Sequence, residues 1–307
     1  MKQRGVALIM AVVLVAIATV LSTRVGTEAA LDLRRTAGIG ALNQGWEVAL
    51  GAEAWAAQIL NKDAGDSRTD SLAEDWAQPI PPLPIDGGTI EGGLEDMQAR
   101  FNVNNLITAE GTIDEENVAR FKDLLRLAAV DERWASMMAD WLDTDTVETF
   151  PDGAEDGVYI SQAPPYRTAN GPITTTAEIL ALPGFTLEDY ARIRPHIAAL
   201  PVGTRVNVCT ATPLVLAAIV HGGTDFGDAD ALARNRTDGC FPTLDDLRAT
   251  LGDEQFQGLQ QSVAENTSWF RLLTTVSIGT SQLTLYSLLE RNNAGGIRAV
   301  LRSIGTE

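Results

Sequence analysis

The chain has 307 residues, of which 45% are hydrophobic and 21% are charged, a composition that excludes a largely disordered protein. Its 41 acidic residues against 23 basic ones give a formal net charge of −18, which repels phosphate backbones and argues against nucleic acid as a main ligand. With only two cysteines and two histidines, the chain has too few ligands for a tetrahedral zinc site, so carboxylates are the expected metal donors.

The first predicted element is an apolar segment at the N-terminus. Lys2 and Arg4 precede Gly5, and the next charge is Arg24, which leaves an uncharged stretch of about 18 residues, near the lower length limit of a spanning helix. The positive-inside rule keeps Lys2 and Arg4 in the cytoplasm and sends the rest of the chain outward.

Two ordinary interpretations of this segment stay open. One is a cleaved secretory signal, for which Ala16-Ile17-Ala18 offers a cleavage site. Cleavage there leaves the apolar residues 19–22 at the mature N-terminus, which is awkward for a secreted protein. The other is an uncleaved membrane anchor.

A third interpretation explains the glycine. The stretch K-Q-R-G-V-A-L-I-M-A-V-V resembles the class III signal of type IV pilins and type II secretion pseudopilins. This resemblance implies that a prepilin peptidase cuts between Gly5 and Val6, methylates the new N-terminus and leaves the apolar helix in the mature chain.

The sequence beyond the apolar segment predicts a continuation of the helix to about residue 61, because it is rich in alanine and has no proline. The expected apolar face of this helix consists of Leu31, Leu42, Trp46, Leu50 and Trp55.

Met10 occupies the fifth position after the expected cleavage site. Most pseudopilins have glutamate there, which in the family pairs with the terminal ammonium of a neighbouring subunit. A subunit without this carboxylate cannot make that pairing to a subunit above it, so the resemblance implies a position at the tip. The alternative is that Met10 is simply another residue that a membrane tolerates.

The rest of the chain reads as a loop, strands, a long helical block and strands again. The Pro-rich passage around residues 67–87 predicts a loop, and residues 88–103 predict one or two strands. Three more strands are predicted near the C-terminus, in the segments S-W-F-R-L-L-T-T-V-S-I-G, T-S-Q-L-T-L-Y-S-L-L-E-R and G-G-I-R-A-V-L-R-S-I. Strands on both sides of a helical block indicate one sheet with an inserted domain.

This organisation resembles the protein K family, the largest minor pseudopilins of the type II secretion system. The shared motifs are R-F-N-V-N-N at 100–105, A-D-W-L-D-T-D at 139–145, G-A-E-D at 153–156, A-P-P-Y-R-T-A-N at 163–170 and V-N-V-C-T-A at 206–211. The implied fold class is α+β: a pilin-like long helix and small antiparallel sheet, with a large α-helical insert of two subdomains similar to SAM and helix-hairpin-helix units.

The expected domains follow from this resemblance. They are a leader at 1–5, a transmembrane and amphipathic helix at 6–61, a loop with the first strands at 62–103, the insert at 104–265, and the C-terminal strands at 266–307. The two subdomains of the insert are expected at about 104–204 and 205–265.

A cluster of acidic residues in the insert predicts a metal site. Its carboxylates lie near a glycine-containing loop and offer the hard oxygens that Ca²⁺ prefers. The candidate ligands are Asp143, Asp145, Glu155 and Asp156, with Asp140 as a weaker candidate. The alternative is a solvated acidic loop. The resemblance favours structural calcium, since members of the protein K family bind it in this domain.

The two cysteines predict a disulfide. On the implied topology Cys209 and Cys240 lie outside the membrane, where a pair of cysteines usually joins. The bond would close a loop of about 30 residues and stabilise the fold by roughly 3 kcal/mol. Two buried free thiols are the alternative.

The sequence L-P-G-F-T-L-E-D-Y at 182–190 resembles a helix-hairpin-helix unit, which in other proteins binds DNA phosphate. The acidic Glu188 and Asp189 beside its turn favour a structural hairpin, and no nucleic-acid partner is expected. The alternative function, which the hairpin resemblance alone suggests, is that of a DNA-handling protein anchored at a type IV pilus. His196 and His221 lie in apolar contexts that favour packing, and the absence of catalytic motifs predicts that the chain is not an enzyme.

The resemblance also implies location and partners. The chain would cross the bacterial inner membrane once, with its bulk in the periplasm. Its partners would be the prepilin peptidase, the minor pseudopilins called proteins I and J, and the major pseudopilin. The insert would face the outer-membrane secretin or the secreted cargo.

Overall fold

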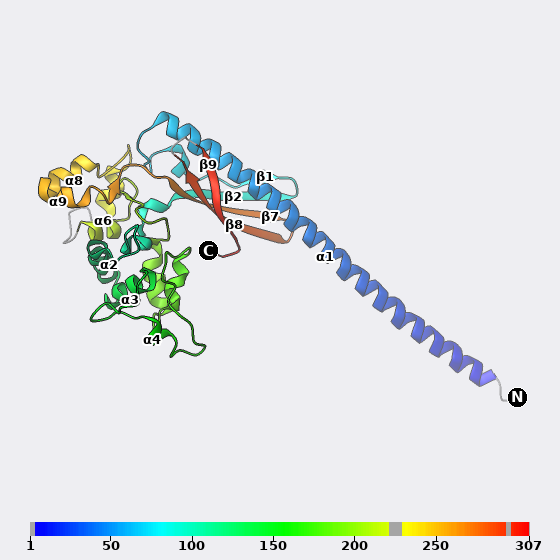
Figure 1. The fold of residues 1–307 in the computed structure, drawn as a ribbon. Coiled ribbons are helices and arrows are strands. Elements are labelled where there is room, and N and C mark those ends of the chain that lie inside the picture. The colour runs from blue at the N-terminus through cyan, green and yellow to red at the C-terminus, as the bar shows by residue number, and fades with distance from the viewer. Residues whose placement is uncertain (1–3, 221–228, 293–295, 307) are drawn as a thin grey trace.

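The computed structural model describes residues 4–220, 229–292 and 296–306. A long helix carries a sheet along its C-terminal half, and a mainly helical insert lies at the end of the sheet (Figure 1). The helices are α1 Arg4–Asp66, α2 Glu115–Leu127, α3 Arg133–Leu142, α4 Asp156–Tyr159, α5 Leu187–Ile193, α6 Pro213–Ile219, α7 Ala229–Asn235, α8 Leu244–Leu251 and α9 Asp253–Leu259. The strands are β1 Leu83–Ile85, β2 Gly88–Asp96, β3 Phe101–Asn102, β4 Ile197–Ala198, β5 Val206–Asn207, β6 Val263–Ala264, β7 Trp269–Ile278, β8 Ser281–Arg291 and β9 Ile297–Ile304.

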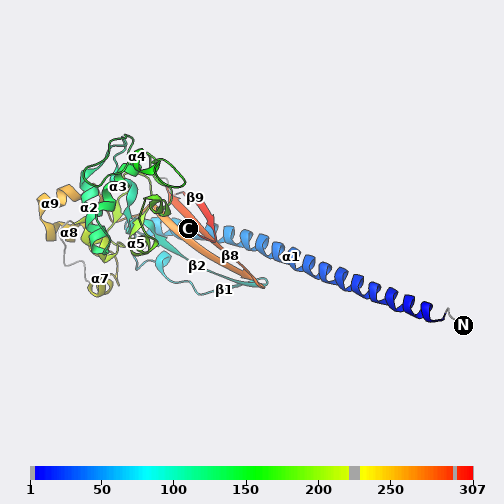
Figure 2. The ribbon, with the colours of Figure 1, turned by 90° about the horizontal axis from the view of Figure 1, so that it is seen from below.

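Helix α1 runs unbroken over 63 residues and ends at Asp66 rather than at about residue 61. Its N-terminal part projects from the molecule and contacts neither the sheet nor the insert in two perpendicular views (Figures 1 and 2). The hydroxyls of Thr19 and Thr23 donate to the carbonyls of Val15 and Thr19, both at 2.8 Å, so these polar groups are satisfied within the helix.

The sheet covers only part of the predicted apolar face of α1. Trp46 packs against the cluster around Ala49, as the prediction requires. Leu31 and Leu42 lie on the same side of the helix but before the sheet, and are 50% and 43% exposed, whereas Trp55, 45% exposed, lies on another side, so its place in the predicted face was wrong. The residues that the sheet buries recur at spacings of three and four along the helix, and most of them are small: Gly45, Ala49, Glu53, Ala56 and Leu60. The small side chains at Gly45, Ala49 and Ala56 let the helix backbone approach the sheet closely.

The sheet has five antiparallel strands in the order β1-β2-β7-β8-β9. Buried residues alternate along β7 and β8, as expected for strands with one covered face. The inner side chains, such as Phe270, Leu272 and Leu289, pack against Ala56 and Leu60 of α1. Gly279, with a φ of +57°, lies in the tight turn between β7 and β8. The three C-terminal strands predicted from the sequence are β7, β8 and β9.

The insert consists of two units, each closed by a short parallel strand pair. β3 pairs with β4, and β5 pairs with β6. The two units share one continuous hydrophobic core that extends from Phe101 to Val263. Because Phe101 and Val103 belong to this core, the insert begins a few residues before the expected position 104.

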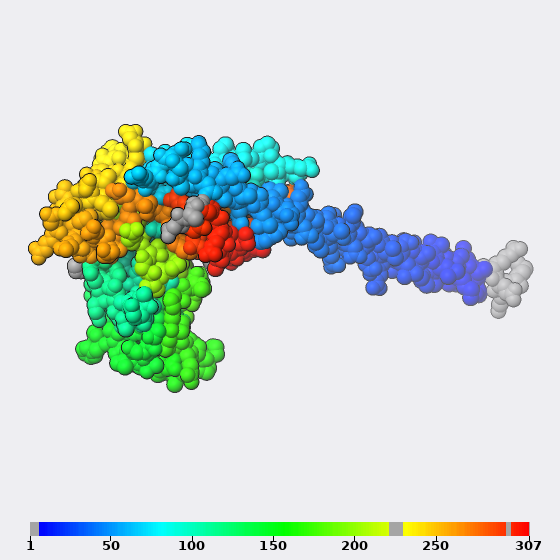
Figure 3. All heavy atoms as spheres, turned by 45° about the horizontal axis from the view of Figure 1, so that its top comes forward, coloured from blue at the N-terminus to red at the C-terminus, as the bar shows by residue number. Residues whose placement is uncertain are grey.

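The helical block is less helical than the sequence suggested. Its helices are short, and segments without helix or strand connect α3 to α4 and follow α4. In a space-filling view the insert forms a bulky mass at the end of the molecule that is remote from the N-terminus (Figure 3).

Candidate functional site

The acidic cluster lies where α3 runs into the loop that precedes α4. Asp140 in α3 is fully buried, and its Oδ2 accepts the backbone N–H groups of Thr149 at 3.0 Å and Ala154 at 2.8 Å. These two bonds fold the loop back onto the helix. Gly153 is required there, because a Cβ at this position would lie 2.2 Å from Asp140 Oδ2 and 2.3 Å from the nitrogen of Thr149.

Three of the predicted residues come together beside this loop. Asp143, Asp145 and Glu155 each place one carboxylate oxygen so that these oxygens all lie within 4.8 Å of one another. Asp143 and Glu155 are buried, with exposed fractions of 1% and 3%, whereas Asp145 is exposed. The cluster thus has a buried floor and one side that reaches solvent.

The buried carboxylates raise one another's pKa. Burial, followed by the charges of Asp145 and Asp140, raises the pKa of Asp143 to about 6. Burial, followed by the charges of Asp143 and Asp140, raises the pKa of Glu155 to about 7. Holding these groups ionised together costs free energy unless a positive charge lies among them.

The free oxygens of this site fit a hard metal ion. Within the described residues, Asp140 Oδ1, Asp143 Oδ1 and Glu155 Oε1 are buried and accept no hydrogen bond. Buried carboxylate oxygens normally have a partner, and oxygen atoms in this number are what Ca²⁺ binds. The residues present therefore fit the calcium that the sequence predicted.

Asp156 does not belong to this group of three. Its Oδ1 accepts the backbone N–H of Thr168 at 3.2 Å and the hydroxyl of Thr168 at 3.1 Å, and its Oδ2 lies 3.5 Å from Arg167 Nη1. Asp156 fixes the segment after α4, while Asp140 shapes the loop.

Asn170 is a residue that the sequence did not single out. Its side-chain N–H donates to the carbonyl of Asp145 at 3.3 Å, and its buried Oδ1 has no partner among the described residues. It adopts the left-handed region with a φ of +46°, which asparagine tolerates. The motif A-P-P-Y-R-T-A-N was the available signal, since it ends on this amide.

The apolar N-terminal part of α1 fits a membrane anchor by length and composition. α1 is the one helix in the described part of the chain that is long and apolar enough to cross a membrane, and its most apolar 18-residue window is entirely exposed. Val6 is 55% exposed and Met10 is 63% exposed, so neither packs within the chain. Gly5 lies in the first turn of α1, while residues 1–3 of the expected leader lie outside the described residues.

Cys209 and Cys240 form the predicted disulfide, with a Cα–Cα distance of 4.5 Å. It joins the segment after β5 to the segment before α8. The alternative of two free thiols is therefore wrong.

The histidines and the acidic residues beside the hairpin turn were the other candidates from the sequence. His196 Nδ1 lies 3.1 Å from the hydroxyl of Thr212, and burial lowers the pKa of this histidine. His221 lies outside the described residues. Glu188 and Asp189 occupy the first turn of α5, where their charges would repel a phosphate.

The chain is similar to known proteins along its whole length. A family model described as "Type II secretion system (T2SS), protein K" matches residues 99–202, which span the first unit of the insert. Type II secretion system protein K of Pseudomonas aeruginosa is 33% identical over 314 residues, which cover 99% of this chain and 93% of the relative. The protein of the same description from Klebsiella pneumoniae is 35% identical over 225 residues, which cover 69% of this chain and 68% of the relative.

A solved structure has the same fold. The crystal structure of the GspK-GspI-GspJ complex from the type 2 secretion system of enterotoxigenic Escherichia coli contains a chain that matches with a TM-score of 0.78 at 22% identity. The match covers 89% of the present chain and 100% of the solved one, so the two chains share most of their fold.

Proposed function

Because the chain belongs to the type II secretion system protein K family, we propose that it is a minor pseudopilin at the tip of the secretion pseudopilus. The observation that carries this proposal is the continuous α1, which joins an exposed apolar segment to a folded domain and has Met10 where a pilin subunit would have glutamate. A subunit without that carboxylate lacks the group that would pair with a subunit above it.

The proposed processing explains the N-terminus. Cleavage by the prepilin peptidase between Gly5 and Val6, followed by methylation of Val6, leaves α1 as an inner-membrane anchor. The folded part of the chain would then lie in the periplasm. Determining the mature N-terminus by mass spectrometry tests this directly: methylated Val6 supports it, and a start at Thr19 contradicts it.

The proposed partners are the minor pseudopilins I and J, with the major pseudopilin below them. The solved neighbour is part of a complex with GspI and GspJ, which supports this assignment. On this chain Leu31 and Leu42 continue the helix face of Ala49 and Glu53 beyond the sheet, and both remain substantially exposed. We infer that companion helices cover this face.

Co-purification tests the partner proposal. The tagged full-length chain, co-expressed with proteins I and J and extracted in detergent, is expected to retain both. Leu31→Glu with Leu42→Glu should weaken retention by about tenfold, because buried charges are costly in a helix interface.

Leu33→Glu is the matched control for this experiment. Leu33 is 72% exposed and lies about half a turn from Leu31, so its substitution should leave retention close to wild type. Failure of the wild-type chain to retain proteins I and J contradicts the proposal.

The insert is proposed to cap the assembly. Figure 3 places it at the end away from the membrane anchor, where its bulk would hinder addition of another subunit. In that position it would face the secretin or the cargo. Its two closed units begin with the related sequences R-F-N-V-N-N and R-V-N-V-C-T, which supports two SAM-like subdomains. The role is structural rather than catalytic.

Calcium in the insert is proposed as a structural ion. Asp143, Asp145 and Glu155 would hold it, and the ion would supply positive charge that fixes the end of α3 to the start of α4. Asp140 would shape the loop, and Asn170 Oδ1 is a further candidate donor.

Chelation tests the calcium proposal. Removing Ca²⁺ from the full-length chain is expected to lower its Tm by about 5 °C or more, as expected for a ligand that binds only the folded state. Asp143→Asn with Glu155→Gln should reduce this shift. The exposed Asp152→Asn, in the same loop, should preserve it. An equal shift in all three proteins contradicts the site.

A further inference from the structure

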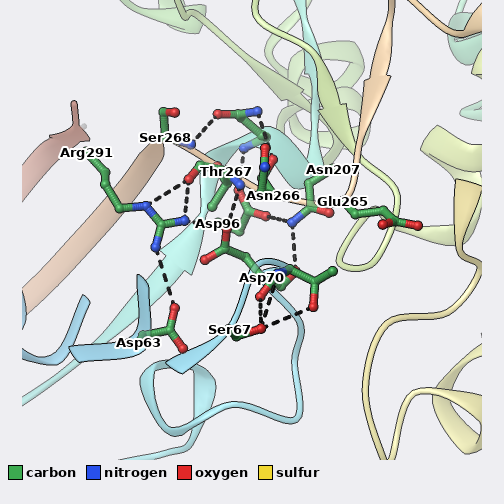
Figure 4. A network of polar contacts seen from close by, with 12 residues as sticks. Asp63, Ser67, Asp70, Asp96, Asn207, Glu265, Asn266, Thr267, Ser268 and Arg291 are labelled. Atoms are coloured by element: carbon green, nitrogen blue, oxygen red, sulfur yellow. Dashed lines mark hydrogen bonds and ion pairs between the residues drawn. The ribbon is translucent and has the colours of Figure 1, made fainter. Parts of the chain in front are cut away.

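A second acidic cluster lies far from the insert loop, at the C-terminal end of α1. It consists of Asp63 in the last turn of α1, Asp70 in the loop that follows, and Glu74 just before the turn at Asp75–Ala77. One carboxylate oxygen from each lies within 4.8 Å of the other two. Figure 4 shows the side chains of Asp63 and Asp70 near the guanidinium of Arg291, which comes from the end of β8.

The carboxylate of Asp70 is only partly satisfied. Its side chain is 3% exposed, and its Oδ2 accepts the backbone N–H of Thr267 at 2.8 Å and a bond from Arg291. Its Oδ1 is buried and has no partner among the residues that the structure describes. Such an oxygen has lost its hydrogen bonds to water on folding and has no protein hydrogen bond that replaces them.

Asp63 is in a similar position. Its side chain is 9% exposed, and its buried Oδ2 accepts no hydrogen bond from any described residue. Arg291 Nη1 lies 3.5 Å from this oxygen, a distance typical of an ion pair rather than of a hydrogen bond. Burial, followed by the charges of Glu74 and Asp70, raises the pKa of Asp63 to about 7.

Glu74 completes the cluster with a fixed orientation. Its Oε2 accepts the backbone N–H of Ser71 at 3.1 Å and the indole N–H of Trp76 at 2.8 Å. The carboxylates of Asp63, Asp70 and Glu74 therefore lie close together, and one guanidinium, that of Arg291, lies beside them. When all of them are ionised, the cluster carries an excess negative charge.

The cluster is open to ions from solution. A surface hollow of about 500 Å³ is lined by Asp63, Ser67 and Glu74, together with Trp55, Lys62 and Asp66. Lys62 Nζ lies 3.7 Å from Asp75 Oδ2, so this cation is engaged beside the cluster. Asp70 does not line the hollow, and the free oxygens of Asp63 and Asp70 are buried, so an ion would reach them from the hollow past Asp63 and Glu74.

We propose that Asp63, Asp70 and Glu74 bind a hard divalent cation such as Ca²⁺, at a site separate from the one in the insert. The cation would use the carboxylate oxygens that lack hydrogen-bond donors and would offset the charge that Arg291 leaves unbalanced. This inference rests on the cluster alone and holds whether or not the chain acts as a pseudopilin.

The site would act on the joint between the membrane helix and the insert. The backbone N–H of Asp70 donates to the carbonyl of Glu265 at 2.9 Å, and its carbonyl accepts from Asn207 Nδ2 at 2.9 Å. Asp63 belongs to α1, whereas Asn207 belongs to β5 of the insert. A cation that held Asp63 to Asp70 would thus fix the end of α1 to the loop that contacts the insert through Asn207 and Glu265.

Calcium stoichiometry tests the proposal in a background that lacks the insert site. The full-length chain with Asp143→Asn and Glu155→Gln, purified in detergent and freed of metal, is dialysed against Ca²⁺. The bound metal is then measured by mass spectrometry. We expect about one equivalent of calcium to remain per chain. Adding Asp63→Asn and Glu74→Gln should remove it.

A matched control uses two other acidic residues of the same hollow. Asp66→Asn with Asp75→Asn makes the same change in charge and should leave the equivalent bound. Absence of calcium from the background protein overturns the proposal, as does an equal loss in the control. Should Asp63→Asn with Glu74→Gln fail to fold, Tb³⁺ emission from the background protein decides the matter.

The Tb³⁺ measurement relies on Trp76, whose indole donates to Glu74, and on Trp55, which lines the same hollow. Emission excited through tryptophan, displaced by Ca²⁺ and reduced several-fold by Trp55→Phe with Trp76→Phe, supports the site. Emission that is absent, or that this double substitution leaves unchanged, overturns it. Neither result depends on pseudopilus assembly, so this proposal and the proposed function can fail separately.

Discussion

Asp96 joins the sheet to the insert through a buried carboxylate. It ends β2, and its Oδ1 accepts the backbone N–H of Gln98 at 2.7 Å. Its Oδ2 accepts the side-chain N–H of Asn207 at 2.8 Å (Figure 4) and the hydroxyl of Thr210 at 2.6 Å. Burial raises its pKa to about 6 although these donors act in the opposite direction. One side chain thus couples two regions that are distant in sequence.

The raised pKa of Asp96 predicts a pH dependence of stability. Between about pH 4 and pH 6 the folded protein binds more protons at this residue than the unfolded chain, so the free energy of unfolding falls as the pH rises. Asp96→Asn removes this contribution. The stability of wild type relative to the variant should fall by on the order of 3 kcal/mol across that window, measured by urea unfolding. Parallel pH profiles would contradict the prediction.

Gly153 allows the loop before α4 to approach Asp140 closely, and this role can be tested by a single substitution. Alanine there would place its Cβ 2.2 Å from Asp140 Oδ2 and 2.5 Å from the carbonyl oxygen of Thr149. The loop must move, so Gly153→Ala should lower the free energy of unfolding by about 1–3 kcal/mol and weaken calcium binding. Gly157→Ala is the control, because its Cβ would have no neighbour closer than 3.9 Å. Equal Tm values for the two variants would refute this account.

At the scale of the elements, α1 is held to the sheet by a polar contact as well as by small residues. Glu53 on the buried face accepts the hydroxyl of Ser287 at 2.5 Å and two bonds from Arg302 in β9, each at 2.8 Å. The sequence pattern gave no sign of this, since a charged residue on a helix usually faces solvent. The contact sets the register between α1, β8 and β9.

Removing Arg302 should therefore loosen the helix from the sheet. Arg302→Ala leaves the buried carboxylate of Glu53 with a single hydroxyl donor, and we expect a loss of about 1–3 kcal/mol in chemical unfolding. The paired Glu53→Met, Arg302→Met variant should recover part of it, because no charge remains buried.

Arg298 in the same strand provides the control for this pair. Its side chain is 70% exposed and lies 2.6 Å from Glu290, so Arg298→Ala should cost less than about 1 kcal/mol. If Arg298→Ala lowered the free energy of unfolding as much as Arg302→Ala, the buried carboxylate of Glu53 would not be the cause of the effect.

In the whole molecule, the sheet with α1 and the insert are packed around different hydrophobic clusters. α1 and the sheet form the clusters around Leu60 and Ala49, the insert forms one large cluster, and a small cluster of Met97, Ala198 and Leu200 joins the two parts. The insert leaves β2 after Asp96 and returns to β7 near Phe270, and these two residues are direct partners across the sheet. Its two ends are therefore close together, and the sheet packs mainly on α1 rather than on the chain between them.

Deletion of the insert tests this separation. Replacing residues 99–266 by a short Gly-Ser linker should leave α1 and the five strands folded, because paired residues of neighbouring strands lie about 5 Å apart. The variant should retain its helix and strand signals by circular dichroism and melt cooperatively. Its stability should be reduced, since Met97 loses its contacts with Ala198 and Leu200. Loss of the strand signal would contradict the separate packing of the two parts.

The candidate metal site was predictable in part. The sequence pattern identified Asp143, Asp145 and Glu155 from their type and proximity, and the structure brings those three together. The separate roles of Asp140 and Asp156 could not be read from spacing, because they depend on which backbone N–H groups the loop presents. The cluster of Asp63, Asp70 and Glu74 was missed because the end of α1 was expected before Asp63.

The sequence by itself determined the architecture of this protein: an uncharged N-terminal segment, a long proline-free helix, strands on both sides of an insert, and a cysteine pair. Each of these follows from local composition and periodicity. The tertiary structure alone decided how much of the α1 face the sheet covers and that Gly45, Ala49 and Ala56 make the close contact, because small residues carry no strong apolar signal and act only by allowing close approach. It also decided the partners of Glu53, Asp70 and Asp96, since a buried carboxylate is stable only where distant segments supply its donors.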